Sequence, residues 1–199
     1  MVFRLGCVVE GDGETEAVPV LVRRLATDLH PGLQVVTTNL VLRVPRYRLV
    51  RPGELERHVV FLAARLADAI LVIIDSDDDC PAELGPLLHS RAINAHSALP
   101  VAVVLAKFEY ESWFLGAAGS LAGRRGLGTS LQPHPDPESV RGAKGWLSRN
   151  MEGSRIYKET SDQAALTAVF DMDAALSACD SFRKCHKEIG SLLSGCVAG

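Results

Sequence analysis

The sequence predicts an α/β fold in which a mostly parallel sheet is flanked by helices and followed by a helical C-terminal extension. Apolar runs typical of strands alternate with runs of helical periodicity through residues 1–117, which is the pattern of βαβ units. Two of these runs, AILVII at residues 69–74 and PVAVVL at residues 100–105, are almost purely apolar, as buried parallel strands are. We therefore expect an α/β domain at residues 1–117, with a mobile loop and a helical part at residues 118–199 packed on it.

The α/β part divides into elements where the periodicity of the apolar residues changes. Residues 5–9 form a short apolar run that ends in two valines, which predicts a buried strand. From Ala17 onward, apolar side chains recur at spacings of three and four, which predicts a helix. By the same criteria we expect strands at residues 34–38, 40–44, 69–74 and 100–105, and helices at residues 54–67, 81–96 and 112–118.

The C-terminal part begins with a long stretch that lacks periodicity. Residues 119–137 are rich in glycine and proline, and a loop of this length inside a compact domain is usually functional or mobile. Helical patterns return after it, at residues 138–151, 162–170 and 181–193.

The composition is that of an ordinary soluble protein, with 47% hydrophobic and 23% charged residues. The formal net charge of −3 argues weakly against a strongly basic nucleic-acid binder. The five cysteines include no CxxC pair and favour reduced thiols. No apolar stretch reaches the roughly 20 residues of a membrane helix, and the acids at residues 10–16 interrupt any signal-peptide pattern. We expect a cytoplasmic protein that does not associate with membranes.

The most informative motif is EGDGETE at residues 10–16, which lies between the first strand and the first helix. Glycines at positions 11 and 13 allow the chain to turn sharply there. Glu10 then lies at the carboxyl end of a strand, where open α/β sheets hold their ligands. Glu14 lies at the helix start, where acids interact favourably with the helix dipole. Taken alone, the motif has two interpretations, an acidic helix cap or a functional site.

Acidic residues also follow two later strands, at residues 75–79 and at residues 109–111. The carboxyl ends of parallel strands share one edge of the sheet, so these carboxylates should converge with those of the first motif. Converging carboxylates raise one another's pKa unless a cation offsets their charge, and oxygen ligands suit Mg²⁺ or Mn²⁺. The candidate metal ligands are Glu10, Glu14, Asp75, Asp77, Asp79, Glu109 and Glu111.

The spacing of Asp75 and Asp77 suits a shared ion, because side chains two apart in an extended segment point the same way. On its own, the acidic run at residues 75–79 is equally typical of a solvated turn that caps the next helix. The convergence of three acidic clusters favours the metal site. The six histidines are scattered and show no zinc-ligand spacing.

These acids resemble a known motif. Glu10-Gly11-x-x-Glu14 after a first strand, with Asp75-x-Asp77 after a later one, is similar to the Toprim domain of topoisomerases, primases and overcoming-lysogenization-defect (OLD) nucleases. The resemblance is closest to a Toprim-like family named only as a domain of unknown function, number 4276. The similar blocks occur in order through nearly the whole chain: VVEGDGETEAVPVLVRRL, IDSDDDCP, EYESWFLGA, AKGWL, YKETSDQAAL and SFRK.

The resemblance implies a Toprim-like (Rossmann-like) sheet and metal-dependent phosphodiester chemistry. It assigns Glu10 as a metal ligand or general acid/base, Asp75 and Asp77 as metal-binding aspartates, and Glu14 as the second acid of the first motif. Glu109 and Glu111 belong to a block of this family that carries no assigned role. Lys107, just before them, has two interpretations: a catalytic group that stabilises phosphate charge in the transition state, or a surface lysine.

We therefore expect a Mg²⁺- or Mn²⁺-dependent phosphodiesterase or nuclease that acts on nucleic acid, with two ions held by Glu10, Glu14, Asp75 and Asp77. The sequence contains no P-loop, so any ATP hydrolysis must come from a partner protein. Association with the OLD nucleases suggests a two-component ATPase–nuclease system in phage defence, and the chain is compatible with an oligomer. Two alternatives stay open: a non-catalytic regulatory module that binds metal or nucleotide, and phosphoryl transfer on a small molecule.

Overall fold

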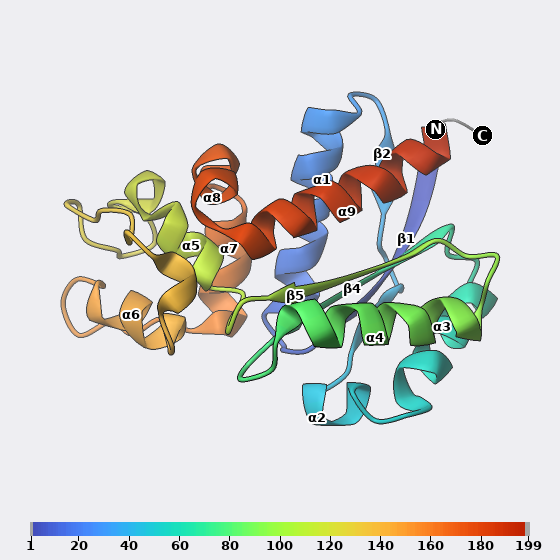
Figure 1. Cartoon of the computed structure of the whole chain (residues 1–199). Coiled ribbons are helices and arrows are strands. Elements are labelled where there is room, and N and C mark those ends of the chain that lie inside the picture. The colour runs from blue at the N-terminus through green and yellow to red at the C-terminus, as the bar shows by residue number, and fades with distance from the viewer. Residues whose placement is uncertain (1, 198–199) are drawn as a thin grey trace.

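A parallel sheet forms the middle layer of the molecule (Figure 1). The computed structural model describes residues 2–197, without the side chains of residues 196 and 197. Within these residues the five strands are arranged in the order β2-β1-β4-β5, with β3 also pairing with β1. Their bounds are β1 Val2–Val9, β2 Gln34–Val36, β3 Val41–Arg43, β4 Ala69–Asp75 and β5 Val101–Ala106. The predicted α/β class is confirmed.

Strands β2 and β3 lie along the same side of β1, one after the other. β2 pairs with residues 2–4 of β1, and β3 pairs with residues 7–9. The other side of β1 pairs with β4, so the carboxyl ends of β1 and β4 are direct neighbours. β3 leads into the short helix α2 (Arg46–Leu49), which places an arginine-rich segment at this same edge of the sheet.

Helices cover both faces of the sheet (Figure 1). On one face lie α1 (Glu14–Leu29) and α9 (Asp180–Val197), and on the other lie α3 (Glu54–Ala64) and α4 (Pro81–Ala95). Each strand supplies side chains to both layers because successive residues of a strand point to opposite faces. In β4, Leu71 and Ile73 join the core under α1, whereas Ile70 and Val72 join the core under α3 and α4.

Besides α9, the C-terminal half contains short helices that pack against the α1 side of the sheet. They are α5 (Ser112–Gly116), α6 (Ala143–Arg149), α7 (Ala164–Thr167) and α8 (Met172–Ala178), with 3₁₀ turns at Ala118–Leu121 and Pro137–Ser139 and a π-helical turn, η3, at Glu159–Gln163. The aromatic rings of Trp113 and Phe170 both contact that of Phe182, at centroid distances of 5.2 and 5.5 Å. Side chains of the Gly- and Pro-rich segment, including Leu127 and Leu131, are buried in the same core.

Several helices differ in extent from the sequence prediction. The helix expected at residues 138–151 is limited to α6, because Gly142 has a left-handed backbone (φ 79°) that separates it from the preceding 3₁₀ turn. The helix expected at residues 162–170 is shorter and begins with the π-helical turn. The helix expected to reach residue 67 ends at Ala64, because Leu66 is also left-handed (φ 60°).

Two other expectations concern membranes and thiols. Across residues 2–197, no helix combines the length and the apolar character needed to cross a membrane. Cys7, Cys80, Cys179 and Cys185 are free thiols, and the side chain of Cys196 lies outside the described part of the chain.

Candidate metal centre

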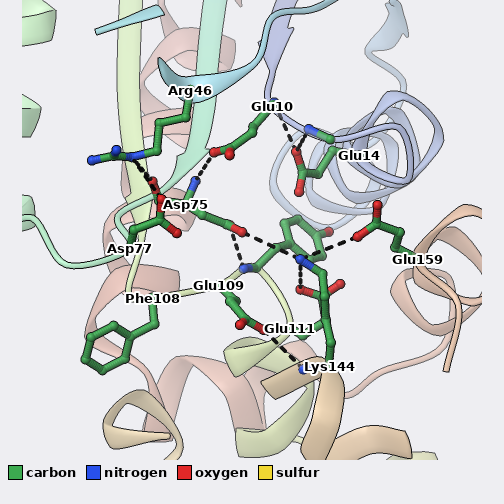
Figure 2. A network of polar contacts seen from close by, with 12 residues as sticks. Glu10, Glu14, Arg46, Asp75, Asp77, Phe108, Glu109, Glu111, Lys144 and Glu159 are labelled. Atoms are coloured by element: carbon green, nitrogen blue, oxygen red, sulfur yellow. Dashed lines mark hydrogen bonds and ion pairs between the residues drawn. The ribbon is translucent and has the colours of Figure 1, made fainter. Parts of the chain in front are cut away.

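An acidic pocket of about 390 Å³ opens at the carboxyl edge of the sheet. The ends of β1 and β4 contribute to its lining, together with α2, α6 and the turn η3 (Figure 2). Its acidic lining residues are Glu10, Glu14, Asp75, Asp77 and Glu159, and its basic ones are Arg43, Arg46 and Lys144. The pocket therefore brings together four of the seven metal ligands that the sequence suggests.

Glu10 and Glu14 connect the first motif to the neighbouring strand. Oε2 of Glu14 accepts hydrogen bonds from the backbone N–H groups of Glu10 (3.0 Å) and Gly11 (2.7 Å). Oε2 of Glu10 accepts one from the backbone N–H of Asp75 (3.3 Å), which ties the end of β1 to the end of β4. Glu14 thus holds the loop before α1 and also lines the pocket. Its hydrogen bonds go to N–H groups that precede the helix, so they are not those of a helix cap.

Gly13 is needed for a reason other than the one that the sequence suggests. Its backbone is in the ordinary helical region (φ −65°), so the expectation that it supplies a glycine-specific turn is wrong. A Cβ at this position would instead lie 2.7 Å from the carbonyl oxygen of Glu159 and 2.2 Å from Oε1 of Gln163. Only glycine lets the turn η3 approach the start of α1 this closely, and this approach brings Glu159 to the pocket.

Asp75 and Asp77 both line the pocket, but not in an extended segment. Asp75 is the last residue of β4 and is buried, and its Oδ1 accepts a hydrogen bond from the backbone N–H of Tyr110 (2.8 Å). Asp77 follows in a turn with a left-handed backbone (φ 47°), is exposed, and lies 3.6 Å from Nε of Arg46. The expected alternation along an extended strand is therefore wrong, because β4 ends before Asp77.

A second left-handed residue supports this turn from the neighbouring strand end. Phe108 has φ 59°, a strained conformation for an aromatic residue. Its backbone N–H donates to Oγ of Ser76 (2.9 Å), and its carbonyl oxygen accepts from the N–H of Asp77 (3.2 Å). The strain is thus maintained by contacts that fix the two strand ends against each other, while the Phe108 ring points away from the acidic pocket (Figure 2).

Asp79 and Glu109, two of the other expected ligands, are engaged elsewhere. Asp79 forms an ion pair with the guanidinium of Arg46 and does not line the pocket. Oε2 of Glu109 accepts a hydrogen bond from the backbone N–H of Lys144 (3.1 Å), at the start of α6. Both side chains position basic residues at the pocket, and the structure does not bring them together with Glu10 and Glu14.

Glu111 is fully buried behind the pocket, with 0% of its surface exposed. Its Oε1 accepts hydrogen bonds from the hydroxyl of Tyr157 (2.8 Å) and from Nε2 of Gln163 (3.2 Å). Its Oε2 is buried without a hydrogen bond and lies 3.6 Å from Nζ of Lys144. Burial raises the pKa of Glu111 to about 7, although Lys144 and Tyr157 favour the ionised form.

Lys144 is a site residue that the sequence analysis did not select. Its ammonium group lies among three carboxylates, 3.4 Å from Glu159, 3.6 Å from Glu111 and 3.9 Å from Asp75 (Figure 2). Burial alone would lower the pKa of Lys144, but Glu111 and Asp75 outweigh it and raise that pKa. The only sequence signal was its place in the block AKGWL, because no local spacing links Lys144 to acids on distant segments.

Lys107 lies outside this cluster. It follows Ala106, the last residue of β5, and it does not line the acidic pocket. Nζ of Lys107 lies 4.3 Å from the centroid of the Phe108 ring. Lys107 also lines a second, more apolar pocket of about 580 Å³ beside α4 and the start of α9. The structure therefore does not bring Lys107 to the acidic pocket.

The carboxylates of the acidic pocket carry more negative charge than the neighbouring basic groups offset. Burial, followed by the charges of Asp77 and Glu14, raises the pKa of Glu10 to about 7. Burial, followed by Glu14 and Glu111, raises the pKa of Asp75 well above its usual range. The pKa of Glu14 is also raised, chiefly by burial. A further cation in the pocket would favour the ionised form of all three groups.

The donors of the pocket fit a hard divalent cation such as Mg²⁺ or Mn²⁺. They are carboxylate oxygens, and the pocket lining includes no histidine or cysteine. Glu10 and Glu14 each use Oε2 for backbone hydrogen bonds, and no backbone N–H of residues 2–197 donates to their Oε1 atoms. Across residues 2–197, however, no three acidic, histidine or cysteine side chains already form a coordination sphere. Binding of an ion would therefore require side-chain rotation.

The fold and the pocket together define an α/β protein with an acidic centre at the carboxyl edge of a parallel sheet. The family described as Domain of unknown function (DUF4276) has a model that matches residues 9–189, and the chain belongs to this family. The match runs from the last residue of β1 into α9 and includes every lining residue of the acidic pocket. Comparisons with curated proteins and with solved structures gave no match.

Proposed function

We propose that the protein is a metal-dependent phosphodiesterase of Toprim type that acts as a nuclease on nucleic acid. One observation carries this proposal. Four acids line a single pocket at the ends of two adjacent parallel strands: Glu10, Glu14, Asp75 and Asp77. This is the arrangement that the resemblance to Toprim domains implies for an acidic motif after the first strand and an Asp-x-Asp motif after a later one.

The acidic residues have separate roles in this proposal. Glu10 and Glu14 would each present one carboxylate oxygen to a Mg²⁺ or Mn²⁺ ion, and exposed Asp77 would rotate from Arg46 toward it. Asp75 is buried and held by the Tyr110 N–H, so it fixes the shape of the site. An ion bound there would supply an activated water and neutralise charge on the departing oxygen.

Basic side chains near these acids suit a phosphate-containing substrate. Arg43 and Arg46 both line the pocket from the segment that joins β3 to α2. Arg46 is held in place because its guanidinium donates to the carbonyl oxygens of Asp75 (3.1 Å) and Ser76 (3.3 Å). A phosphodiester entering the pocket would therefore meet a fixed guanidinium next to the candidate metal ligands.

The proposal includes a partner. Because the sequence contains no P-loop, ATP hydrolysis would come from a separate ATPase, as in a two-component relative of the single-chain OLD nucleases. A function in phage defence follows from the same resemblance. An ATPase gene next to the gene for this chain would support the partnership.

The direct test is nicking of supercoiled plasmid DNA with Mg²⁺ or Mn²⁺, alone and with the partner ATPase. Glu10→Ala should abolish nicking, since Glu10 joins the two strand ends and faces the ion. The matched control is Glu16→Ala, which removes an exposed acid of the same motif that does not line the pocket. Equal nicking by wild type and Glu10→Ala, or none by wild type with its partner, would refute the nuclease proposal and favour a non-catalytic module or small-molecule chemistry.

Metal binding is tested separately by calorimetry with Mn²⁺. The double variant Asp75→Asn, Asp77→Asn should bind Mn²⁺ at least tenfold more weakly than wild type, because it removes two of the five pocket carboxylates. Unchanged affinity would mean that these aspartates take no part in holding an ion.

A further inference from the structure

The ammonium group of Lys144 lies at a place in the acidic centre that a cation would otherwise have to fill. Three carboxylates from different parts of the chain face its Nζ: Asp75 at the end of β4, Glu111 before α5 and Glu159 in the turn η3. We propose that Lys144 fills one of two cation positions in this centre, so that the chain binds a single divalent ion, on the side of Glu10 and Glu14. This inference rests on the metal centre of the proposed function and replaces the two ions expected from the sequence with one.

The lysine is held in this position by its backbone as well as by its charge. Gly142 adopts a left-handed conformation (φ 79°) directly before α6 and so determines where the helix starts. The N–H of Lys144 then donates to the carboxylate of Glu109 (3.1 Å). Only 38% of the Lys144 side chain is exposed, so its direction into the pocket is set by the surrounding structure.

Glu111 provides an independent reason for a permanent cation here. Its Oε2 is fully buried and receives no hydrogen bond within residues 2–197, and Nζ of Lys144 is the cationic group that faces it, at 3.6 Å. A buried carboxylate oxygen without a hydrogen bond is costly unless a positive charge lies next to it. In its ionised form, Glu111 therefore needs a cation at this place whether or not an ion occupies the rest of the pocket.

The remaining carboxylate oxygens indicate where the divalent ion would bind. Both oxygens of Asp75 are engaged, one with the N–H of Tyr110 and the other facing Lys144. No backbone N–H of the described residues 2–197 donates to Oε1 of Glu10 or of Glu14, and both side chains line the pocket. A hydrogen bond from the Gln163 side chain lowers the pKa of Glu14, although burial raises it more. A second divalent ion beside Asp75 and Glu111 would be repelled by the ammonium group at short range in a partly buried site.

The experiment counts Mn²⁺ ions bound per chain at saturation, by calorimetry and by electron paramagnetic resonance of free Mn²⁺. Wild type should bind one ion. Lys144→Met, which keeps the length of the side chain and removes its charge, should bind two, because Asp75, Glu111 and Glu159 become free to hold an ion. Lys144→Arg keeps the charge and should bind one. Lys184→Met, an exposed lysine on α9 outside the acidic pocket, is the matched control and should also bind one.

Two ions on wild type, or one ion on both wild type and a folded Lys144→Met, would overturn the inference and leave the metal centre intact. No ion on wild type would overturn both the inference and the proposed metal centre. The nicking assay measures catalysis independently, so one bound ion without nicking would refute the nuclease and support the role of Lys144. The wild-type count alone keeps the inference falsifiable if Lys144→Met does not fold.

Discussion

At the scale of single residues, buried charge dominates the chemistry of this protein. Glu111 has no exposed surface, yet it has a cationic neighbour and two hydrogen-bond donors. Truncating either Glu111 or Lys144 leaves the other charge unpaired, which lowers the free energy of unfolding. Glu111 thus affects the free energy of unfolding as well as the charge of the candidate site.

The raised pKa of Glu111 predicts how stability changes with pH. In the unfolded chain the carboxyl ionises near pH 4.5, whereas in the metal-free folded protein it keeps its proton up to about pH 7. Between these values the folded state binds more protons, so the free energy of unfolding falls as pH rises, by up to about 1.4 kcal/mol per pH unit from this group. Urea unfolding at pH 5, 6, 7 and 8 should show a smaller fall for Glu111→Gln than for wild type. Parallel curves for the two proteins would contradict this.

Gly13 gives a second prediction at this scale. Gly13→Ala should lower the free energy of unfolding by ~1–3 kcal/mol or more, because its methyl group would meet the backbone carbonyl of Glu159 at 2.7 Å. Gly195→Ala is the control, since no atom lies within 4 Å of a Cβ there, and it should be neutral or slightly stabilising. Equal effects of the two substitutions in thermal or urea unfolding would refute the packing explanation.

At the scale of elements, the start of α9 depends on a residue that is distant in sequence. The carboxylate of Glu138 accepts hydrogen bonds from the backbone N–H groups of Asp180 (2.8 Å) and Ser181 (2.9 Å). These N–H groups have no partner within the helix, and a negative charge at this end is favourable. Glu138, in the segment before α6, therefore connects that segment to a helix that covers the sheet.

We expect Glu138→Ala to lower the free energy of unfolding by about 0.5–2 kcal/mol, the range for loss of a helix N-cap. Glu138→Gln should cost less, since its amide oxygen still accepts one hydrogen bond. Glu152→Ala removes an exposed glutamate and serves as the control in urea unfolding. A cost for Glu138→Ala no larger than that for Glu152→Ala would mean that the cap contributes nothing.

At the scale of the whole molecule, the two parts of the chain share one core. The core on the α1 side of the sheet contains Leu21 and Trp113 together with Leu166, Phe182 and Ile189 from the C-terminal part. Lys144 and Glu159 of the acidic pocket also come from that part. The second half of the chain thus completes both the core and the candidate site.

A fragment of residues 1–117 should therefore not fold cooperatively. Removal of the C-terminal helices would expose the apolar face of α1 and the fully buried aromatic rings of α5. Near-UV circular dichroism should show no fixed aromatic signal, and urea unfolding should show no cooperative transition. A sharp transition with wild-type aromatic signals would show that the sheet domain is independent of the helical part.

The sequence by itself determined the layered α/β fold and the position of the acidic edge. Apolar runs such as residues 69–74 are typical of buried parallel strands. Parallel strands place their carboxyl ends at one edge of the sheet, so local patterns predict that Glu10 and Asp75 lie close together, as they do. The tertiary structure decided which charges meet there. Lys144 and Glu159 reach the pocket because Gly13 permits close packing and Gly142 sets the start of α6, while Lys107 lines a different pocket. Such contacts join residues that are far apart in the chain, so local periodicity cannot predict them.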